Sequence, residues 1–350
     1  MNILHANRTP IGLDLGDWFI KAIQLSRAQG KWQIAAASII PRLRPGEPID
    51  LAEIERLTDI LDRQGFRGRR IVTAPSGTQV ACEALELPPR ESGAPIEQIA
   101  RMEIARLQRL EPESFEIALW DIPGSTRSSS SSTVMATSYA HEKSDALINL
   151  LESCGWVVFA IDLKAWAYAR CAAHGALPQP VAVVDCGAHA TSFVLLDQGN
   201  VTYERTLSEI SFASLTDLIC KQFKTNQLTA EYLVRQMSEP ICQVDMDRQK
   251  DDQWSELRAM VQEFEEKLSA QLQVSLDYVS RRYARLNLCH IRLVGGGALV
   301  EDLDLRLGKQ LGLTVKKLTP SELFKYQPWI GQACQSPILT ASLGLALYEL

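Results

Sequence analysis

The sequence predicts an α/β protein with two similar lobes, because one strand–turn–strand pattern occurs twice along the chain. The first copy spans residues 11–25 and turns through Asp14-Leu15-Gly16, and the second spans residues 181–196 and turns through Asp185-Cys186-Gly187. A buried apolar strand that ends in Asp-x-Gly and continues into a second strand is typical of a β-hairpin. A third segment, Gly295-Gly296-Gly297, follows another apolar strand and precedes a helix. Together these segments predict two lobes that face a shared ligand.

In the first half, apolar residues alternate in the strands and recur every three to four positions in the helices. One expected helix carries Leu51, Ile54 and Leu57 on a single face and ends before Gly65. A proline-rich linker interrupts the pattern at 88–95. Residues 82–160 are therefore expected to form a small α+β subdomain inserted into the first lobe. The expected strands are 11–15, 20–25, 32–40, 71–74, 80–87, 115–122, 133–139 and 156–161, and the expected helices are 51–64, 96–110 and 143–155.

The second half repeats this plan. Its longest expected helix carries Phe264, Leu268 and Leu272 at helical spacing, which predicts a face buried in the core and not a partner surface. The glycines from 295 interrupt the strand that precedes them. The expected strands are 181–184, 191–196, 201–207 and 291–294, and the expected helices are 214–223, 229–236, 257–286, 299–311 and 341–348.

Composition is typical of a globular protein and argues against several functional classes. The chain has 350 residues, 46% of them hydrophobic and 22% charged, which is enough for two domains with separate cores. A net charge of −6 argues against a nucleic-acid-binding surface. The eight cysteines form no CxxC pair and are expected to be core thiols in a reducing cytoplasm. No apolar stretch reaches the roughly 20 residues of a membrane span, and residues 1–10 lack a signal core, so no direct membrane insertion is expected.

The Asp-x-Gly turns indicate phosphate chemistry. Glycine lets the backbone approach a ligand closely, and the amides of such a turn can face an anion. An aspartate can hold hydrated Mg²⁺, which keeps most of its waters and needs few protein oxygens. The alternative is structural, since an aspartate before glycine often caps a tight turn. Asp14 and Asp185 are therefore candidate magnesium contacts, and residues 295–297 are a candidate adenosine contact.

With all three segments in place, the chain resembles the actin-like ATPase superfamily, which includes actin, Hsp70 chaperones, sugar kinases and FtsA. Within it, the chain is most similar to the PilM family, the cytoplasmic actin-like proteins of type IV pilus assembly. The similarity covers nearly the whole chain and depends on the order and spacing of the motifs. The stretches that carry it are 11–25, 85–121, 155–173, 183–223, 295–298 and 341–347.

This resemblance implies a two-lobed actin-like (ribonuclease H-like) ATPase fold with an inserted small α+β subdomain, and bound ATP with Mg²⁺ between the lobes. The implied domains are a first lobe at 1–81, the inserted subdomain at 82–160, a connecting helix at 161–178, a second lobe with the adenosine motif at 179–340 and a closing helix at 341–350. The implied nucleotide-binding residues are Asp14, Gly16, Asp185, Gly187, Thr191, Gly295, Gly296 and Gly297, and Asp14 and Asp185 would hold Mg²⁺ through water.

The resemblance further implies a cytoplasmic scaffold for a type IV pilus or a related secretion system. Its partners would be the N-terminal peptide of a PilN-like bitopic membrane protein and other pilus assembly proteins, with no nucleic acid. An extended peptide commonly docks on an edge strand or in a groove. The expected site is a cleft between the first lobe and the insertion, with helix 96–110 as a wall. No amphipathic tail follows Leu350, so the chain is expected at the inner face of the cell membrane through this partner.

Four departures from the superfamily pattern predict weak or absent hydrolysis. Asp17-Trp18-Phe19 stands where active relatives carry small hydroxyl residues, and a carboxylate there repels phosphates. Lys164 stands where a carboxylate often positions the attacking water, His189 is inserted in the second hairpin, and residues 209–212 replace a Gly-Gly pair. Either the first hairpin tip has moved away from the nucleotide or the phosphate site is degenerate. Lys21 is interpreted as a solvated strand-end residue, and His189 as a turn residue.

Two other functions stay open at this stage. One is a working ATPase or small-molecule kinase of the same fold, which needs a catalytic carboxylate and an open phosphate site. The other is an interaction module that never binds nucleotide.

Overall fold

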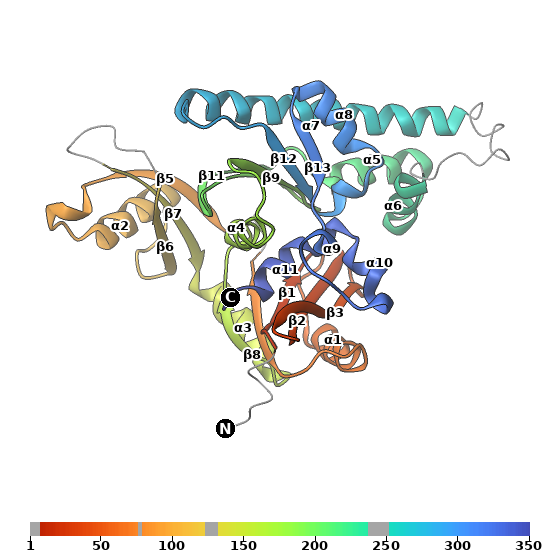
Figure 1. Cartoon of the computed structure of the whole chain (residues 1–350), viewed down its shortest axis with the longest axis horizontal. Helices are drawn as coiled ribbons and strands as arrows, with labels where there is room; N and C mark the ends of the chain where they lie inside the picture. Colours follow the sequence, from red (N-terminus) through yellow and green to blue (C-terminus); the bar gives the residue numbers. More distant parts are fainter. Residues whose placement is uncertain (1–7, 76–78, 123–131, 237–251) are drawn as a thin grey trace.

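The computed structural model describes residues 8–75, 79–122, 132–236 and 252–350 (Figure 1). Two five-stranded sheets form two lobes, with strand orders β3-β2-β1-β4-β8 and β11-β10-β9-β12-β13. In each sheet three antiparallel strands are followed by two strands that pair in parallel. The shared order confirms the mixed α/β fold with two similar lobes that the sequence predicts.

Helices α1 and α3 cover one face of the first sheet. Because side chains alternate along a strand, Ile11 and Leu13 of β1 point to the same face, where they are fully buried in one cluster with Leu57 and Leu61 of α1. This cluster is the core of the first lobe. The elements of this lobe are β1 (Ile11–Leu15), β2 (Phe19–Ala28), β3 (Lys31–Pro41), α1 (Leu51–Arg63), β4 (Arg70–Ala74), α3 (His141–Ser153) and β8 (Val157–Ile161).

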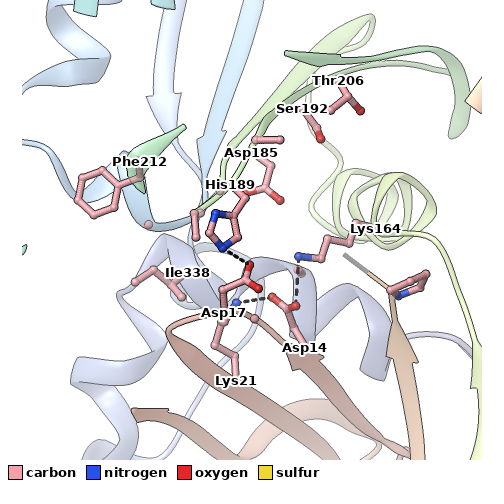
Figure 2. Close-up of a pocket in the computed structure, with 18 of the residues that line it drawn as sticks. Asp14, Asp17, Lys21, Lys164, Asp185, His189, Ser192, Thr206, Phe212 and Ile338 are labelled. Atoms are coloured by element: carbon pink, nitrogen blue, oxygen red, sulfur yellow. Dashed lines mark hydrogen bonds and ion pairs between the residues drawn. The ribbon is translucent and has the colours of Figure 1, made fainter. Parts of the chain in front are cut away.

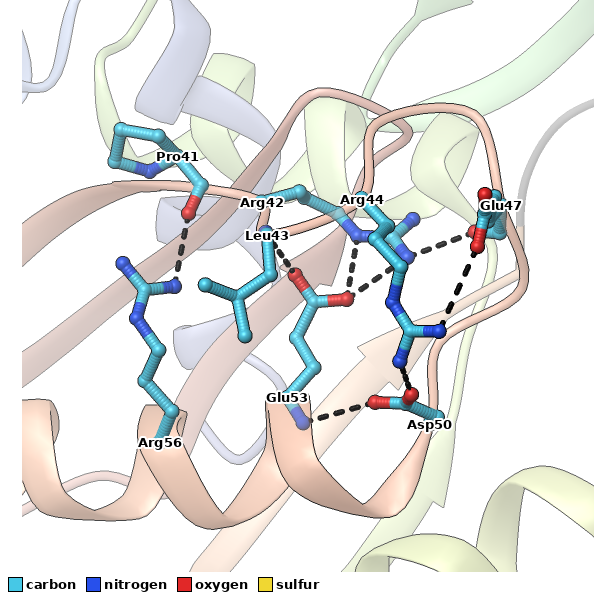
Figure 3. A network of polar contacts seen from close by, with 8 residues as sticks. All are labelled: Pro41, Arg42, Leu43, Arg44, Glu47, Asp50, Glu53 and Arg56. Atoms are coloured by element: carbon cyan, nitrogen blue, oxygen red, sulfur yellow. Dashed lines mark hydrogen bonds and ion pairs between the residues drawn. The ribbon is translucent and has the colours of Figure 1, made fainter.

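A buried ion pair fixes the start of α1 against the end of β3 (Figure 3). Asp50 caps the helix by accepting a hydrogen bond from the amide of Glu53 at 3.0 Å. The buried Glu53 carboxylate pairs with Arg42 at 2.9 Å and accepts from the amide of Leu43 at 3.0 Å. A buried carboxylate needs such partners, so this network determines how the chain passes from β3 to α1.

The inserted subdomain is a three-stranded antiparallel sheet of order β5-β7-β6, covered by α2. Ala100 and Ile104 of α2 are buried against Leu85 of β5. This unit is shorter than the expected range 82–160, because β8 pairs with β4 and Leu151 of α3 lies in the first-lobe core. Its elements are β5 (Ala81–Leu87), α2 (Ile96–Gln108), β6 (Phe115–Asp121) and β7 (Ser132–Ala140).

The second lobe buries its helices against the second sheet. Leu268 and Leu272 of α7 are fully buried there, which confirms the predicted core-facing side of the longest helix. Figure 1 shows α7 running along one side of the molecule next to α8. The elements are β9 (Val181–Cys186), β10 (Thr191–Asp197), β11 (Asn200–Leu207), α5 (Phe212–Phe223), α6 (Gln227–Gln236), α7 (Asp252–Arg282), β12 (His290–Val294), α8 (Leu303–Leu311) and β13 (Thr314–Lys317).

Two helices, α4 (Lys164–His174) and α11 (Thr340–Ala346), lie between the lobes (Figure 1). A Cβ atom on Gly344 would come within 2.1 Å of the Ala167 carbonyl oxygen, and one on Gly12 within 1.9 Å of the Ser342 carbonyl oxygen. Glycine is therefore required for α11 to touch both α4 and β1 backbone to backbone. None of the described helices is both long and apolar enough to cross a membrane. The remaining short helices are η2 (Arg90–Ser92), η5 (Gly296–Leu299), α9 (Pro320–Leu323), η6 (Pro328–Ile330), α10 (Gly331–Cys334) and η7 (Pro337–Leu339).

We expect the substitution Gly344→Ala to lower the free energy of unfolding by about 2 kcal/mol, because the new methyl group meets backbone that cannot move aside. The control is Gly296→Ala, whose Cβ would have ordinary contact with the Phe212 ring at 3.6 Å. It should change stability by less than about 0.5 kcal/mol. Urea unfolding followed by circular dichroism measures both, and equal effects would contradict the close packing of α11.

Candidate functional site

A cleft lies between the two lobes, and the turns of both hairpins line it (Figure 2). It encloses about 1290 Å³ of empty space, including the part that is open to solvent. The first hairpin contributes residues 16–19 and the second contributes residues 187–190. Residues 163–165 at the start of α4, and Gly295 and Gly296 after β12, also belong to the walls. The structure therefore brings the three predicted segments to one place.

The Asp14 carboxylate stands at the centre of the cleft floor and faces two lysines (Figure 2). Lys21 lies directly opposite Asp14 in the pairing of β1 with β2, and its Nζ donates to Oδ2 at 2.6 Å. Lys164, the first residue of α4, places its Nζ 3.1 Å from Oδ1. Lys21 is thus a site residue and not the solvated strand-end residue that the sequence suggested.

The charges of this group reinforce one another. Burial alone would raise the pKa of Asp14, but the Lys164 and Lys21 ammonium groups outweigh it and hold that pKa below its usual range. Burial alone would likewise lower the pKa of Lys164, but the carboxylates of Asp14, Asp185 and Asp17 raise it above its usual value. Asp14 is therefore ionised and Lys164 protonated at neutral pH.

Asp185 of the second hairpin is held by α4 as well. The hydroxyl of Tyr168 donates to Oδ2 of Asp185 at 2.6 Å. Burial, and then the nearby Asp185 charge, raise the pKa of Tyr168, so its proton stays on the hydroxyl. On the other side, Gly295 has a φ of +81°, and a Cβ there would come within 2.2 Å of Asp185 Oδ1. Only glycine fits this position.

The tip of the first hairpin contacts the second lobe. The Trp18 ring lies 5.7 Å from the Phe212 ring, centroid to centroid, and packs on the second-lobe core. The Asp17 carboxylate lies 3.7 Å from Nε2 of His189 in the second hairpin (Figure 2). The bulky tip that departs from the superfamily pattern therefore joins the lobes across the mouth of the cleft.

The expected nucleotide-binding residues divide into two groups. Asp14, Gly16, Asp185, Gly187, Gly295 and Gly296 line the cleft, whereas Thr191 and Gly297 do not. Thr191 is fully buried, and Gly297 packs on Cys186, where a Cβ would come within 2.6 Å of the Cys186 Cβ. Strand alternation instead turns Ser192 toward the cleft, because it pairs with Asp185 across the hairpin.

Sequence reasoning missed several lining residues that reach the cleft from other elements. Tyr168 could have been found, because it follows Lys164 by one helical turn and shares its face. No spacing or motif in the sequence connects Glu204 on β11 or Cys82 on β5 with the cleft. Burial raises the pKa of the Glu204 carboxyl, and burial together with the Glu204 charge raises the pKa of the Cys82 thiol. This pair brings the inserted subdomain into the cleft wall.

The residues of the cleft do not fit the expected magnesium contact. Both carboxylate oxygens of Asp14 face ammonium groups, and one oxygen of Asp185 accepts from Tyr168. Mg²⁺ demands a near-octahedral shell of oxygen atoms, and two ammonium groups beside Asp14 repel a divalent cation. Within the described residues, no group of three or more His, Cys, Asp or Glu side chains could hold a metal ion directly. The expected contact is through water, and the two positive charges beside Asp14 are what oppose it.

Comparison with known proteins identifies the family. The family of the type IV pilus assembly protein PilM matches residues 12–349. The chain belongs to this family. A solved PilM-PilN type IV pilus biogenesis complex contains a chain similar to this PilM-family chain, with a TM-score of 0.77 and 23% identity over 97% of this chain and 98% of that one.

Two further solved structures show the same fold. One is the ethanolamine utilization protein EutJ from Carboxydothermus hydrogenoformans, with a TM-score of 0.55 and 14% identity over 97% of this chain and 89% of that one. The other is MreB5 of Spiroplasma citri bound to ADP, with a TM-score of 0.51 and 14% identity over 97% of this chain and 94% of that one. These likenesses confirm the actin-like fold of the PilM-family chain.

The ionised Asp14 makes the stability of this PilM-family chain depend on pH. Because folding lowers its pKa, its contribution is fully present above the ordinary carboxyl pKa of about 3.9 and is lost progressively as the pH falls from there through the lowered pKa of the folded chain. Asp14→Asn should therefore cost about 3 kcal/mol at pH 7, since two partly buried cations lose their partner, and less at pH 3.

Urea unfolding of the unmodified chain and of Asp14→Asn between pH 7 and pH 3 tests this dependence of stability on pH. The control is Asp62→Asn, which removes an exposed carboxylate paired with Arg69 at 2.7 Å and should cost less than about 1 kcal/mol. A cost at Asp14 that is the same at every pH would contradict the ion cluster.

Proposed function

We propose that this chain is a scaffold of type IV pilus assembly that captures the N-terminal peptide of a PilN-like bitopic membrane protein and holds a nucleotide between its lobes. Membership in the PilM family supports this, as does the likeness to a PilM-PilN complex over almost the full length of both chains. Through this partner the chain would stand at the inner face of the cell membrane, beside other pilus assembly proteins.

Strand β8 is the place that best fits an extended peptide. It lies at the end of the first sheet, and of the described strands only β4 pairs with it. Val157 is 52% exposed and Phe159 is 42% exposed, and the Tyr348 ring packs edge-on against Phe159 at 6.1 Å. An edge strand offers free backbone donors and acceptors, and apolar side chains beside it provide specificity.

Strand β8 is near the expected site along the chain. It follows α3, and α3 contacts β6 and β7 of the inserted subdomain. Helix α2, the expected wall, buries Ala100 and Ile104 on the inserted sheet, but its Met102 is 59% exposed and its Leu107 is 47% exposed. We assign the peptide to the β8 edge, because an edge strand adds backbone hydrogen bonds to apolar contacts, and the exposed apolar side chains of α2 are the alternative contact.

A lysine on the edge tests the peptide site, because a charge there opposes strand addition. We expect Val157→Lys to weaken binding of a fluorescent peptide, taken from the N-terminus of the PilN-like protein of the same organism, by about tenfold or more. The control is Leu305→Lys, at a residue on α8 that is 66% exposed. Fluorescence anisotropy measures both affinities. Equal affinity for the two variants would exclude the β8 edge, and no binding by the unmodified chain would exclude the peptide.

The nucleotide in this proposal has a structural role. The lysines and glycines of the cleft suit a polyphosphate, but the first residue of α4 is Lys164, whose raised pKa prevents it from accepting a proton from water. We expect phosphate release from ATP at the background rate, unchanged by Asp185→Ala. Release above background that falls with this substitution would show a working ATPase instead.

A further inference from the structure

Two lysine side chains supply positive charge at the centre of the cleft. Lys164 reaches the cleft from α4 and Lys21 reaches it from β2, and both ammonium groups contact Asp14, at 3.1 and 2.6 Å (Figure 2). The Asp14 side chain is 4% exposed, whereas that of Lys164 is 25% exposed and lines the cleft. The carboxylate is thus covered by the two lysines, and both lysines line the cleft, Lys164 with the larger exposed fraction.

The carboxylates around Lys164 come from both hairpins. Asp14 and Asp17 belong to the first, and Asp185 belongs to the second; all three act on its charge. Two carboxylates on facing hairpins are the setting in which a divalent cation would balance the charge. Here the Lys164 and Lys21 ammonium groups balance two of the three carboxylates.

Helix stability does not explain a lysine at this position. Lys164 is the first residue of α4, and a positive charge at a helix N-terminus opposes the helix dipole. The preceding Leu163 supplies no side-chain cap. The place of Lys164 is therefore explained by the anions that it faces.

Both ammonium groups keep hydrogen-bonding capacity for a ligand. An ammonium group has three donors, and Asp14 engages one from each lysine. The lack of a side chain at Gly16 leaves room for the Lys21 ammonium group, which lies 2.6 Å from where a Cβ atom would stand, so this group can remain at the cleft surface. Charge-assisted contacts of ammonium groups with phosphate oxygens are strong.

We propose that the cleft binds a nucleoside polyphosphate without a divalent cation, with the Lys164 and Lys21 ammonium groups in the place of magnesium. This rests on the proposed nucleotide binding between the lobes. It also follows that Lys164 positions the ligand and excludes the metal, because a magnesium ion would have to enter beside two fixed positive charges.

Isothermal titration calorimetry with ATP, in EDTA and in excess MgCl₂ at equal ionic strength, tests the proposal. The unmodified chain should bind with dissociation constants that agree within about threefold in the two conditions. Lys164→Gln should weaken binding in EDTA by about tenfold or more, which is the loss of one charge-assisted contact, and MgCl₂ should restore part of it. Lys164→Arg keeps the charge and should stay independent of magnesium.

The control is Lys309→Gln, at an exposed lysine of α8 outside the cleft, which should bind like the unmodified chain. Thermal unfolding without ligand shows whether each variant is folded. Binding by the unmodified chain that tightens about tenfold or more with MgCl₂ would overturn the inference and leave nucleotide binding intact. No saturable binding in either condition would overturn both.

Discussion

The ion cluster around Asp14 is the interaction on which the cleft depends. Its carboxylate is buried on β1, and its two partners come from β2 and from the first residue of α4. One helical turn later, Tyr168 of the same helix holds Asp185 on the second hairpin. Helix α4 therefore contacts both hairpins through Lys164 and Tyr168, two side chains on one face. These contacts connect the two lobes through one short helix.

Close backbone packing of α11 holds α4 in place. Gly12 and Gly344 let α11 lie directly on β1 and α4. Helix α4, which carries Lys164, therefore cannot shift without moving α11. At the mouth of the cleft, Trp18 packs on the second-lobe core and Asp17 approaches His189. The lobes are thus held together by the chain's own side chains, and a bound nucleotide would add to this closure without creating it. That suits a scaffold more than an enzyme that opens and closes with each turnover.

The fold could be predicted from the sequence because its signals are local. Strand alternation, helical spacing and the order of three glycine segments depend only on near neighbours, and they placed the two lobes and the core-facing side of α7. The place where the insertion ends depends on a distant pairing, β8 with β4, which no local pattern in the sequence predicts. The side chains of the cleft depend on register: a shift of one residue exchanges Thr191 for Ser192. Lys21 looked solvated because its partner, Asp14, is visible only once β1 and β2 are paired.

The proposed role of Lys164 is to hold the place of the cation between Asp14 and Asp185 of the two hairpins. The most direct measurement is a crystal structure of the chain grown with Mn²⁺ and a non-hydrolysable ATP analogue, with data collected at the manganese absorption edge. If Lys164 has this role, there is no anomalous peak between Asp14 and Asp185, and the Lys164 ammonium group contacts both Asp14 and a phosphate oxygen. An anomalous peak between the two carboxylates, with Lys164 turned away from Asp14, would contradict it.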